Sequence, residues 1–351
     1  MSIKNPLRPE KESSRASTGN SGRRLPTLEL RTGISPTDDN MRSLRYLMES
    51  IKEFGGPIGQ AARCLVCIGA DEPPRDLKDD YDWASDYPID FKWVDRDLFK
   101  KWSYHATGCT RFWVESDADI VAFIDVDLLI SGNFDSIVEQ AYQEQEILGF
   151  MAHVSPFGFR EIAETPDHIW WKKVFDEAGL ETPELTWQYS GWGMDWSVLS
   201  PRIVSFDQDH RFGPPYFNYG FVIGPRAYVE KMGETIEEEL EAVTRVRDNY
   251  YKSQVALSLA LQRHKIPCGT LPINYNFPLN IPGKSIRAVN QDPHGENGYE
   301  HIKIFHYIGG RKHFESVGSV RNFLNRNDLS DSWRAFQEKL RIINRKIEGT
   351  L

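Results

Sequence analysis

Short apolar runs alternate with stretches of helical periodicity along most of the chain. The apolar runs predict strands at 28–30, 63–68, 91–94, 120–124, 128–130 and 147–154. The sequence between and after them predicts helices at 41–54, 100–114, 133–143, 167–178, 225–246, 250–262 and 331–347. Strands that alternate with helices form β-α-β units and a parallel sheet. The pattern therefore predicts an α/β fold.

Three parts of the chain depart from this alternation. Residues 1–25 are rich in Ser, Lys, Arg and Pro and predict a disordered, mildly basic tail. Residues 156–215 are irregular and aromatic-rich, which suits a wall that binds an acceptor molecule. Residues 321–351 include an amphipathic helix that is packed on the domain or appended to it. No linker divides residues 26–320, so we expect a single folded domain there.

Two aspartates follow the apolar run at 120–124. Five consecutive apolar residues predict a strand buried on both faces, about the fourth strand of the sheet. Residues i and i+2 of a strand point the same way, so Asp125 and Asp127 aim at one place beyond the carboxyl edge of the sheet. Two ionised carboxylates that close repel each other unless a cation neutralises them. A divalent metal site is one explanation, and an acidic strand end that opens a turn is the other.

A second polar segment, His306-Tyr-Ile-Gly-Gly-Arg-Lys-His-Phe314, follows a strand-like run at 302–305. His306 would complete an Asp-Asp-His site, and mixed oxygen and imidazole ligands favour Mn²⁺ over Ca²⁺. Gly309 allows the backbone to approach phosphate oxygens closely, and Lys312 can offer them a positive charge. A metal ion beside a lysine suggests a diphosphate ligand. The alternative is a structural histidine followed by a glycine turn and exposed basic residues.

Composition narrows the range of partners. A net charge of -9 and a pI near 5.6 argue against nucleic acid. The 10 Trp, 14 Tyr and 19 Phe residues supply flat surfaces on which sugars stack, although most should pack in the core. Four scattered cysteines suit a reducing compartment, and no apolar stretch approaches the roughly 20 residues that span a bilayer. We therefore expect a soluble, cytoplasmic protein; its oligomeric state stays open.

Several tryptophans and a tyrosine gather in the irregular stretch, and we expect one or two of them to face a cleft and the others to be core. They are Trp170, Trp171, Trp187, Tyr189, Trp192 and Trp196.

Four landmarks follow one another in order along the chain. They are the D-x-D run at 123–130, Phe217-Asn218-Tyr219-Gly220, Gln254 with the later Leu271-Pro272 and Tyr275-Asn276, and His306-Tyr307-x-Gly309-x-x-Lys312. In this order they resemble the GT-A glycosyltransferases, and within them the group of glycogenin and the bacterial lipopolysaccharide galactosyltransferases, glycosyltransferase family 8. The resemblance covers about residues 28–314. It implies a Rossmann-like, mixed but mostly parallel sheet flanked by helices.

The resemblance also implies a reaction. The donor would be a nucleotide-sugar, usually UDP-linked, whose diphosphate is bridged by Mn²⁺ or Mg²⁺. The sugar would pass, with retention of configuration, to a hydroxyl of a glycan, lipid-linked or protein acceptor. Asp125, Asp127 and His306 would hold the metal, and Gly309 and Lys312 would contact the donor phosphates.

Four further residues receive a role from the same resemblance. Gln254 and Asn218 would orient the donor sugar and are the candidate catalytic residues. Arg111 would lie near the donor sugar, and Thr32 would lie near the nucleotide at the end of the first strand. From the residues alone, each amide could equally be a core group or a helix cap, and Arg111 a surface arginine.

The chain departs from the pattern of that group beside Gln254. Ser253 precedes it where the group commonly has an acidic residue, which puts the sugar contacts or the mechanism in doubt. The last landmark ends in His313-Phe314 where Pro-Trp is usual. An inverting enzyme would need a protein base, and Asp195 is the first candidate.

Two other functions remain open. In phosphohydrolases of the haloacid dehalogenase type an apolar strand also ends in D-x-D, and its first aspartate attacks phosphate. That resemblance wants the motif on the opening strand, whereas here several strands precede it. The other alternative is a non-catalytic protein that binds nucleotide-sugars or carbohydrates on the same fold. Released UDP, released inorganic phosphate, or binding without turnover would distinguish the three.

Overall fold

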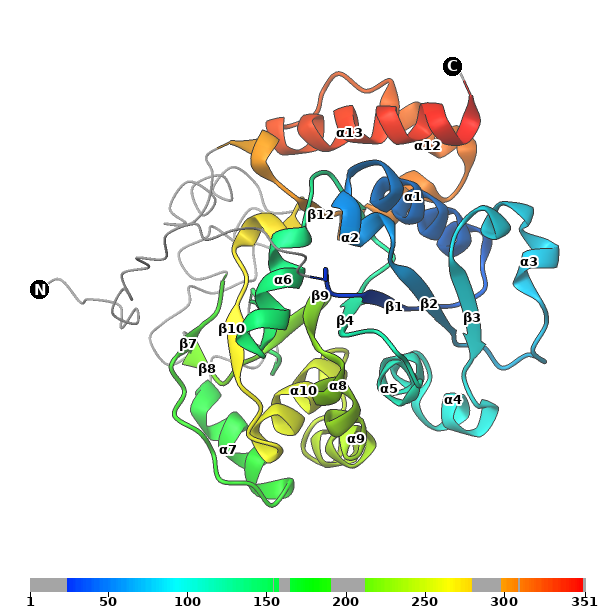
Figure 1. The fold of residues 1–351 in the computed structure, drawn as a ribbon. Helices are drawn as coiled ribbons and strands as arrows, with labels where there is room; N and C mark the ends of the chain where they lie inside the picture. The colour runs from blue at the N-terminus through cyan, green and yellow to red at the C-terminus, as the bar shows by residue number, and fades with distance from the viewer. Residues whose placement is uncertain are drawn as a thin grey trace, which may run out of the picture.

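The computed structural model describes residues 24–153, 155–157, 165–190, 212–279, 298–308 and 310–349. A seven-stranded sheet crosses the molecule in the order β10-β6-β9-β4-β1-β2-β3 (Figure 1). Its strands are β1 (Leu28–Ile34), β2 (Arg63–Ile68), β3 (Ile89–Trp93), β4 (Ile120–Ile124), β6 (Ile147–Met151), β9 (Phe217–Pro225) and β10 (Cys268–Thr270). Strand β9 runs antiparallel to its neighbours β4 and β6, and the other pairs are parallel. The predicted mixed, mostly parallel α/β sheet is confirmed.

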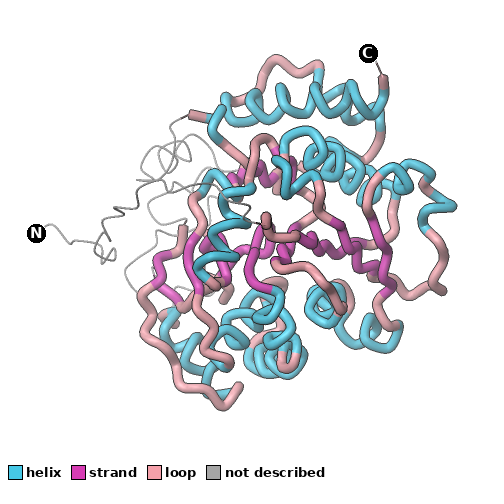
Figure 2. The backbone as a smooth tube through the Cα atoms, in the orientation of Figure 1, coloured by secondary structure: helices cyan, strands magenta, loops and turns pink. Residues whose placement is uncertain are grey.

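Helices cover both faces of this sheet (Figure 2). One face carries α1 (Asp38–Phe54), α2 (Gly56–Gln60) and α6 (Asp135–Glu144). The other carries α4 (Arg96–Trp102), α5 (His105–Trp113), α8 (Arg226–Gly233), α9 (Ile236–Val246) and α10 (Lys252–Arg263). Beyond them lie α3 (Leu77–Asp80), α7 (Asp167–Glu177) and the short pair β7 (Trp187–Gln188) and β8 (Phe212–Gly213).

The central strand β4 shows why its sequence is apolar without interruption. Val121 and Phe123 pack in the hydrophobic cluster of one face, and Ile120, Ala122 and Ile124 pack in that of the other. Side chains alternate along a strand, so a strand covered on both faces needs an apolar residue at every position.

A second, smaller sheet lies at the carboxyl end of β4. It consists of β11 (Phe277–Pro278), β12 (Ile304–His306) and β5 (Leu128–Ile130), and β12 is antiparallel to β5. In this register His306 pairs with Leu128, the residue directly after Asp127. The small sheet therefore brings two segments together that are about 180 residues apart in the sequence.

The chain continues with α12 (Val317–Leu324) and α13 (Asp331–Glu348), which lie beside α1 (Figure 1). Phe336, Leu340 and Ile343 of α13 are fully buried in a cluster shared with β5 and β12. The Tyr46 hydroxyl of α1 donates a hydrogen bond to Asn344 of α13. Helix α13 is thus packed on the domain rather than appended to it.

Two expectations about single elements need correction, and one strand was missed. The helix expected at 100–114 is two helices, because Asp95 caps α4 and Ser103, with φ of 53°, ends it. The helix expected at 225–246 is also two, α8 and α9. Strand β9 was not predicted, since Gly220, Gly224 and Pro225 interrupt its apolar pattern.

Most of the predicted basic tail at 1–25 lies outside the described residues, as does much of the irregular aromatic segment. No described helix combines the length and the apolar character that crossing a membrane requires.

The packing of α13 makes a prediction about stability. Phe336 has 0% exposure and contacts the rings of Phe305, Tyr307, Phe323 and Trp333. Phe336→Ala is expected to lower the free energy of unfolding by about 3–5 kcal/mol, measured by urea denaturation, because it leaves a cavity in the core.

The control for this variant is Ile342→Ala on the same helix. Ile342 is 37% exposed, so this change should stay within about 0.5 kcal/mol. If the two variants proved equally mild, α13 would be an appendage and not a part of the core.

Candidate active site

Backbone hydrogen bonds fix the acidic segment after β4. The Asp125 amide donates to the carbonyl of Gly220 on β9 at 3.1 Å. The Tyr307 amide donates to the carbonyl of Asp127 at 3.0 Å, and the Tyr307 hydroxyl donates to that of Val126 at 3.2 Å. The segment is therefore held between the large sheet and the chain that leaves the small one.

Strand β12 places His306 against the two aspartates. Its Nε2 atom lies 3.4 Å from Oδ1 of Asp127, and these residues are only 4% and 7% exposed. One ligand atom each from Asp125, Asp127 and His306 can be chosen so that all lie within 4.8 Å of one another. The structure thus brings together the three residues that the sequence predicts as metal ligands.

The two carboxylates differ in their electrostatic environment. Burial alone would raise the pKa of Asp127, but His306 and Arg311 outweigh it and lower that pKa below its ordinary value. Burial and the charge of Asp127 raise the pKa of Asp125, although Arg111 lies 3.9 Å from its Oδ1. One carboxylate is thus firmly ionised, and the second gains most from a cation that neutralises the pair.

Hydrogen bonds through two asparagines orient the imidazole. Nδ1 of His306 lies 2.8 Å from Oδ1 of Asn276, whose Nδ2 donates to Oδ1 of Asn218 at 3.1 Å. That oxygen also accepts from the Gly220 amide at 2.8 Å. This network assigns a proton to Nδ1, and Nε2 is then the ring atom that faces Asp127 and can bind a metal ion. A hydrogen bond of this kind orients histidines that bind metals.

Gly220 makes room for this arrangement. A Cβ atom at this position would lie 2.6 Å from Cε1 and Nδ1 of His306 and from Oδ1 of Asn218. Any larger residue would therefore push the imidazole or the asparagine out of place.

These side chains fit a divalent cation. Oδ1 of Asp127 is buried and has no hydrogen-bond partner, which is unfavourable unless something else satisfies it. Two carboxylates with one imidazole form a donor set that suits Mn²⁺ and related ions better than Ca²⁺. The cluster could therefore hold a metal ion.

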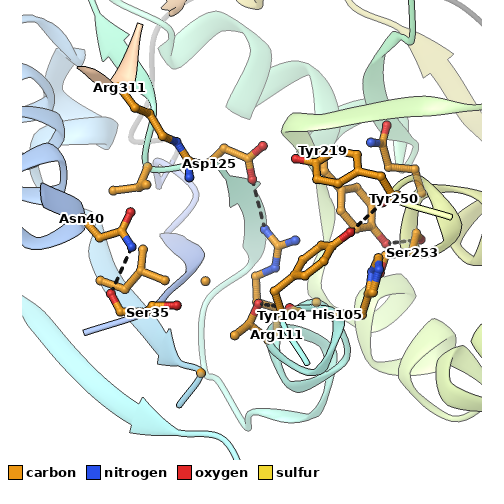
Figure 3. A pocket seen from close by; sticks show the side chains of 17 residues that line it. Ser35, Asn40, Tyr104, His105, Arg111, Asp125, Tyr219, Tyr250, Ser253 and Arg311 are labelled. Carbon is orange, nitrogen blue, oxygen red and sulfur yellow. Dashed lines mark hydrogen bonds and ion pairs between the residues drawn. The ribbon is translucent and has the colours of Figure 1, made fainter. Parts of the chain in front are cut away.

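A pocket of about 270 Å³ opens beside Asp125 (Figure 3). Arg111 lines it from α5 and lies against the rings of Phe123 and Tyr219, with its guanidinium carbon 5.2 and 5.0 Å from the ring centres. The Arg111 carbonyl accepts a hydrogen bond from the buried Arg31, which is paired with Glu29. Arg111 is itself buried, so the alternative of a surface arginine is wrong.

The other predicted site residues lie in different places. Gln254 lines the pocket, and its Oε1 has no hydrogen-bond partner. Asn218 is not among the described residues that line the pocket and instead supports His306. Thr32 is fully buried, whereas Gly33, next in the same strand, lines the pocket.

The structure describes only part of the landmark that runs from His306 to Lys312. Lys312 is exposed on the turn Arg311–Phe314, and Gly309 lies outside the described residues, as does Asp195. Sequence reasoning missed Arg311, whose Nε lies 3.4 Å from Oδ2 of Asp127 and which lines the pocket. Its position one residue before Lys312 was the available signal.

The described aromatic residues of the irregular stretch belong to the core. Trp171 and Tyr189 are fully buried, and Trp170 and Trp187 pack against the same cluster. None of these four lines the pocket, and Trp192 and Trp196 lie outside the described residues.

Comparison with known proteins places the fold. No family model and no curated protein matches the sequence, but solved structures match the fold. The galactosyltransferase LgtC, in complex with donor and acceptor sugar analogs, aligns with a TM-score of 0.50 and 12% identity, over 87% of this chain and 99% of LgtC. The chain has the GT-A fold. The predicted resemblance is thereby confirmed for the fold.

Two further structures agree with this assignment. An active-site mutant of LgtC aligns with a TM-score of 0.51 and 14% identity, over 88% of this chain and 99% of that one. The bifunctional glycosyltransferase WbbM aligns with a TM-score of 0.50 and 13% identity, over 92% of this chain and 51% of WbbM. At these identities the GT-A likeness establishes the architecture and not the reaction.

The orientation of His306 by Asn276 generates a prediction. Asn276→Ala should weaken Mn²⁺ binding by about 10–100-fold, measured by calorimetry on the purified protein, because the ring is no longer oriented. Binding is measured without donor, so the result does not depend on turnover.

Asn274→Ala is a matched control from the same turn. The Oδ1 atom of Asn274 is buried without a partner, whereas Nδ1 of His306 is paired with Asn276. Equal Mn²⁺ affinity in the two variants would contradict the orienting role of Asn276.

Proposed function

We propose that this protein is a metal-dependent glycosyltransferase that moves a sugar from a nucleoside diphosphate donor, UDP-linked, to an acceptor hydroxyl. The observation that carries the proposal is the cluster of Asp125, Asp127 and His306 at the edge of a pocket in a GT-A fold. Glycosyltransferases of this fold provide the analogy, and the chemistry of the cluster supports it independently.

Breaking the bond between a sugar and a phosphate places negative charge on the departing diphosphate. A divalent cation held by the cluster would supply Lewis-acid stabilisation of that charge. Arg311 lies at the same end of the pocket and can add a positive charge there. Lys312, on the same turn, is the second cation that we propose for the donor phosphates, with Gly309 offering its backbone.

The groups on the pocket wall suit a sugar. Arg111 has two nitrogen donors, Nε and Nη1, without hydrogen-bond partners, and the side-chain carbonyl oxygen of Gln254 also has none. We propose that these two residues orient the donor sugar. Asn218 would act indirectly, by helping Asn276 to orient His306. Thr32 is buried in β1, and the carboxyl end of that strand would contact the nucleotide.

We propose retention of configuration, as the resemblance implies. Asp125 is the one carboxylate among the described residues that line it, and the proposal assigns Asp125 to the metal. An inverting transfer requires a protein base, whereas in a retaining transfer a donor phosphate oxygen can accept the proton of the acceptor.

The acceptor would be a glycan, a lipid-linked sugar or a protein. Tyr104 and Tyr250 expose their rings beside the pocket and can stack on a sugar (Figure 3). The four cysteines are free thiols, which supports a cytoplasmic location. The GT-A likeness leaves the dehalogenase alternative without support, and a binding protein without turnover is the remaining alternative.

The metal ligands generate the main functional prediction. Asp127→Asn should lower Mn²⁺-dependent release of UDP from UDP-sugars by at least about 100-fold, because the ionised carboxylate is lost. The assay uses a panel of UDP-sugars, with and without EDTA, and EDTA should abolish wild-type turnover until Mn²⁺ is restored.

Asp117→Asn serves as the control, since Asp117 is exposed and precedes β4 at its opposite end. Turnover by Asp127→Asn at the wild-type rate would refute the metal site. Tight binding of UDP-sugars without turnover by the wild type would instead indicate the binding protein.

The contributions of the neighbouring residues Lys312 and Arg311 can be distinguished by experiment. Lys312→Ala should lower kcat about tenfold without changing Mn²⁺ affinity, because no contact joins Lys312 to a metal ligand. Arg311→Ala should lower kcat and also change Mn²⁺ affinity, because Arg311 contacts Asp127. Unchanged kcat in Lys312→Ala would show that this lysine is ordinary surface.

A further inference from the structure

A pair of side chains in the pocket has no part in holding the metal or the diphosphate. His105 begins α5, and Ser253 lies in the first turn of α10 (Figure 3). Nδ1 of His105 and Oγ of Ser253 are 2.6 Å apart, and both residues line the pocket. The His105 side chain is almost completely buried.

The pair is uncharged at neutral pH. Burial, assisted by the nearby charge of Lys252, lowers the pKa of His105 to about 4. A neutral imidazole has one N–H, so two arrangements exist. Either Nδ1–H donates to Ser253 and the hydroxyl hydrogen is free, or the hydroxyl donates to Nδ1 and its oxygen remains free to accept.

Other polar groups that line the same pocket lack hydrogen-bond partners. Oε1 of Gln254 accepts no hydrogen bond, and neither Nε nor Nη1 of Arg111 donates one. Buried polar groups without partners are unfavourable, so a ligand that offers both donors and acceptors would complete this wall. Each hydroxyl of a sugar offers both.

A neutral sugar matches the pair better than an acidic one. A carboxylate on the sugar would be desolvated against His105 and Ser253, which provide no opposite charge. The charge of Arg111, the cation on this wall, is offset by Asp125 at 3.9 Å, and its N–H groups without partners can donate to neutral hydroxyl oxygens. A hydroxyl group, by contrast, can use either arrangement of the pair.

We propose that Ser253 and His105 determine donor specificity by hydrogen-bonding a hydroxyl of a neutral donor sugar. The inference rests on the proposed glycosyltransferase function and adds the class of sugar to it. It also gives a physical meaning to Ser253, which stands where the resembled group commonly has an acid. An ionised carboxylate can only accept hydrogen bonds, whereas the pair of Ser253 and His105 can either donate or accept one.

The test compares a ligand that has the sugar with one that lacks it. UDP, UDP-glucose, UDP-galactose and UDP-glucuronate are titrated by calorimetry in Mn²⁺ against the wild type, Ser253→Ala and Ser253→Thr. Ser253→Ala should weaken the better UDP-hexose by about 5–10-fold, the value of one hydrogen bond, and leave UDP within about twofold. Ser253→Thr keeps the hydroxyl and should restore most of the affinity.

Ser258→Ala is the matched control on the same helix. Ser258 donates to the Pro215 carbonyl, does not line the pocket, and should not alter the preference for the hexose over UDP. Equal loss of UDP and UDP-hexose in Ser253→Ala, no loss of either, or a wild type that prefers UDP-glucuronate would overturn the inference. A wild type that binds none of the four ligands would instead overturn the proposed function.

Discussion

The burial of Asp127 beside His306 is the constraint on which the arrangement of the site depends. An ionised carboxylate in a protein interior needs opposite charge and hydrogen bonds, and one oxygen of Asp127 has no hydrogen-bond partner. His306 and Arg311 supply part of this compensation, since each places a side-chain nitrogen 3.4 Å from a carboxylate oxygen of Asp127. A cation would complete it. The space at Gly220 and the hydrogen bonds of Asn276 and Asn218 hold the imidazole where that cation would lie.

The two sheets make this arrangement possible. In the large sheet β4 ends directly before Asp125, whose amide is hydrogen-bonded to β9. The small sheet pairs β5 with β12 and so brings His306 alongside. The pocket then has two chemically different parts. Asp125 and Arg311 form a charged part, whereas His105, Ser253 and Gln254 form a neutral part that can exchange hydrogen bonds. Such a division suits a ligand with a charged group at one end and hydroxyls at the other.

The sequence predicted those features that depend on periodicity and on strand geometry. An uninterrupted apolar run located β4, and its period of two placed Asp125 and Asp127 at the carboxyl edge. It did not predict β9, whose glycines serve close packing rather than strand propensity, or the break at Ser103, where a positive φ ends a helix. The roles of Arg311 and Asn276 were also missed, because they depend on three-dimensional hydrogen bonding that residue spacing does not encode. For Thr32, strand position alone did not distinguish a buried residue from one at the pocket.

A crystal structure of the protein with Mn²⁺ and UDP, using anomalous diffraction at the manganese edge, would test the account most directly. We expect one anomalous peak roughly 2.0–2.2 Å from a carboxylate oxygen of Asp125, from one of Asp127 and from Nε2 of His306. A peak bound elsewhere, or no peak at millimolar Mn²⁺ with Asp127 and His306 in place, would contradict the account.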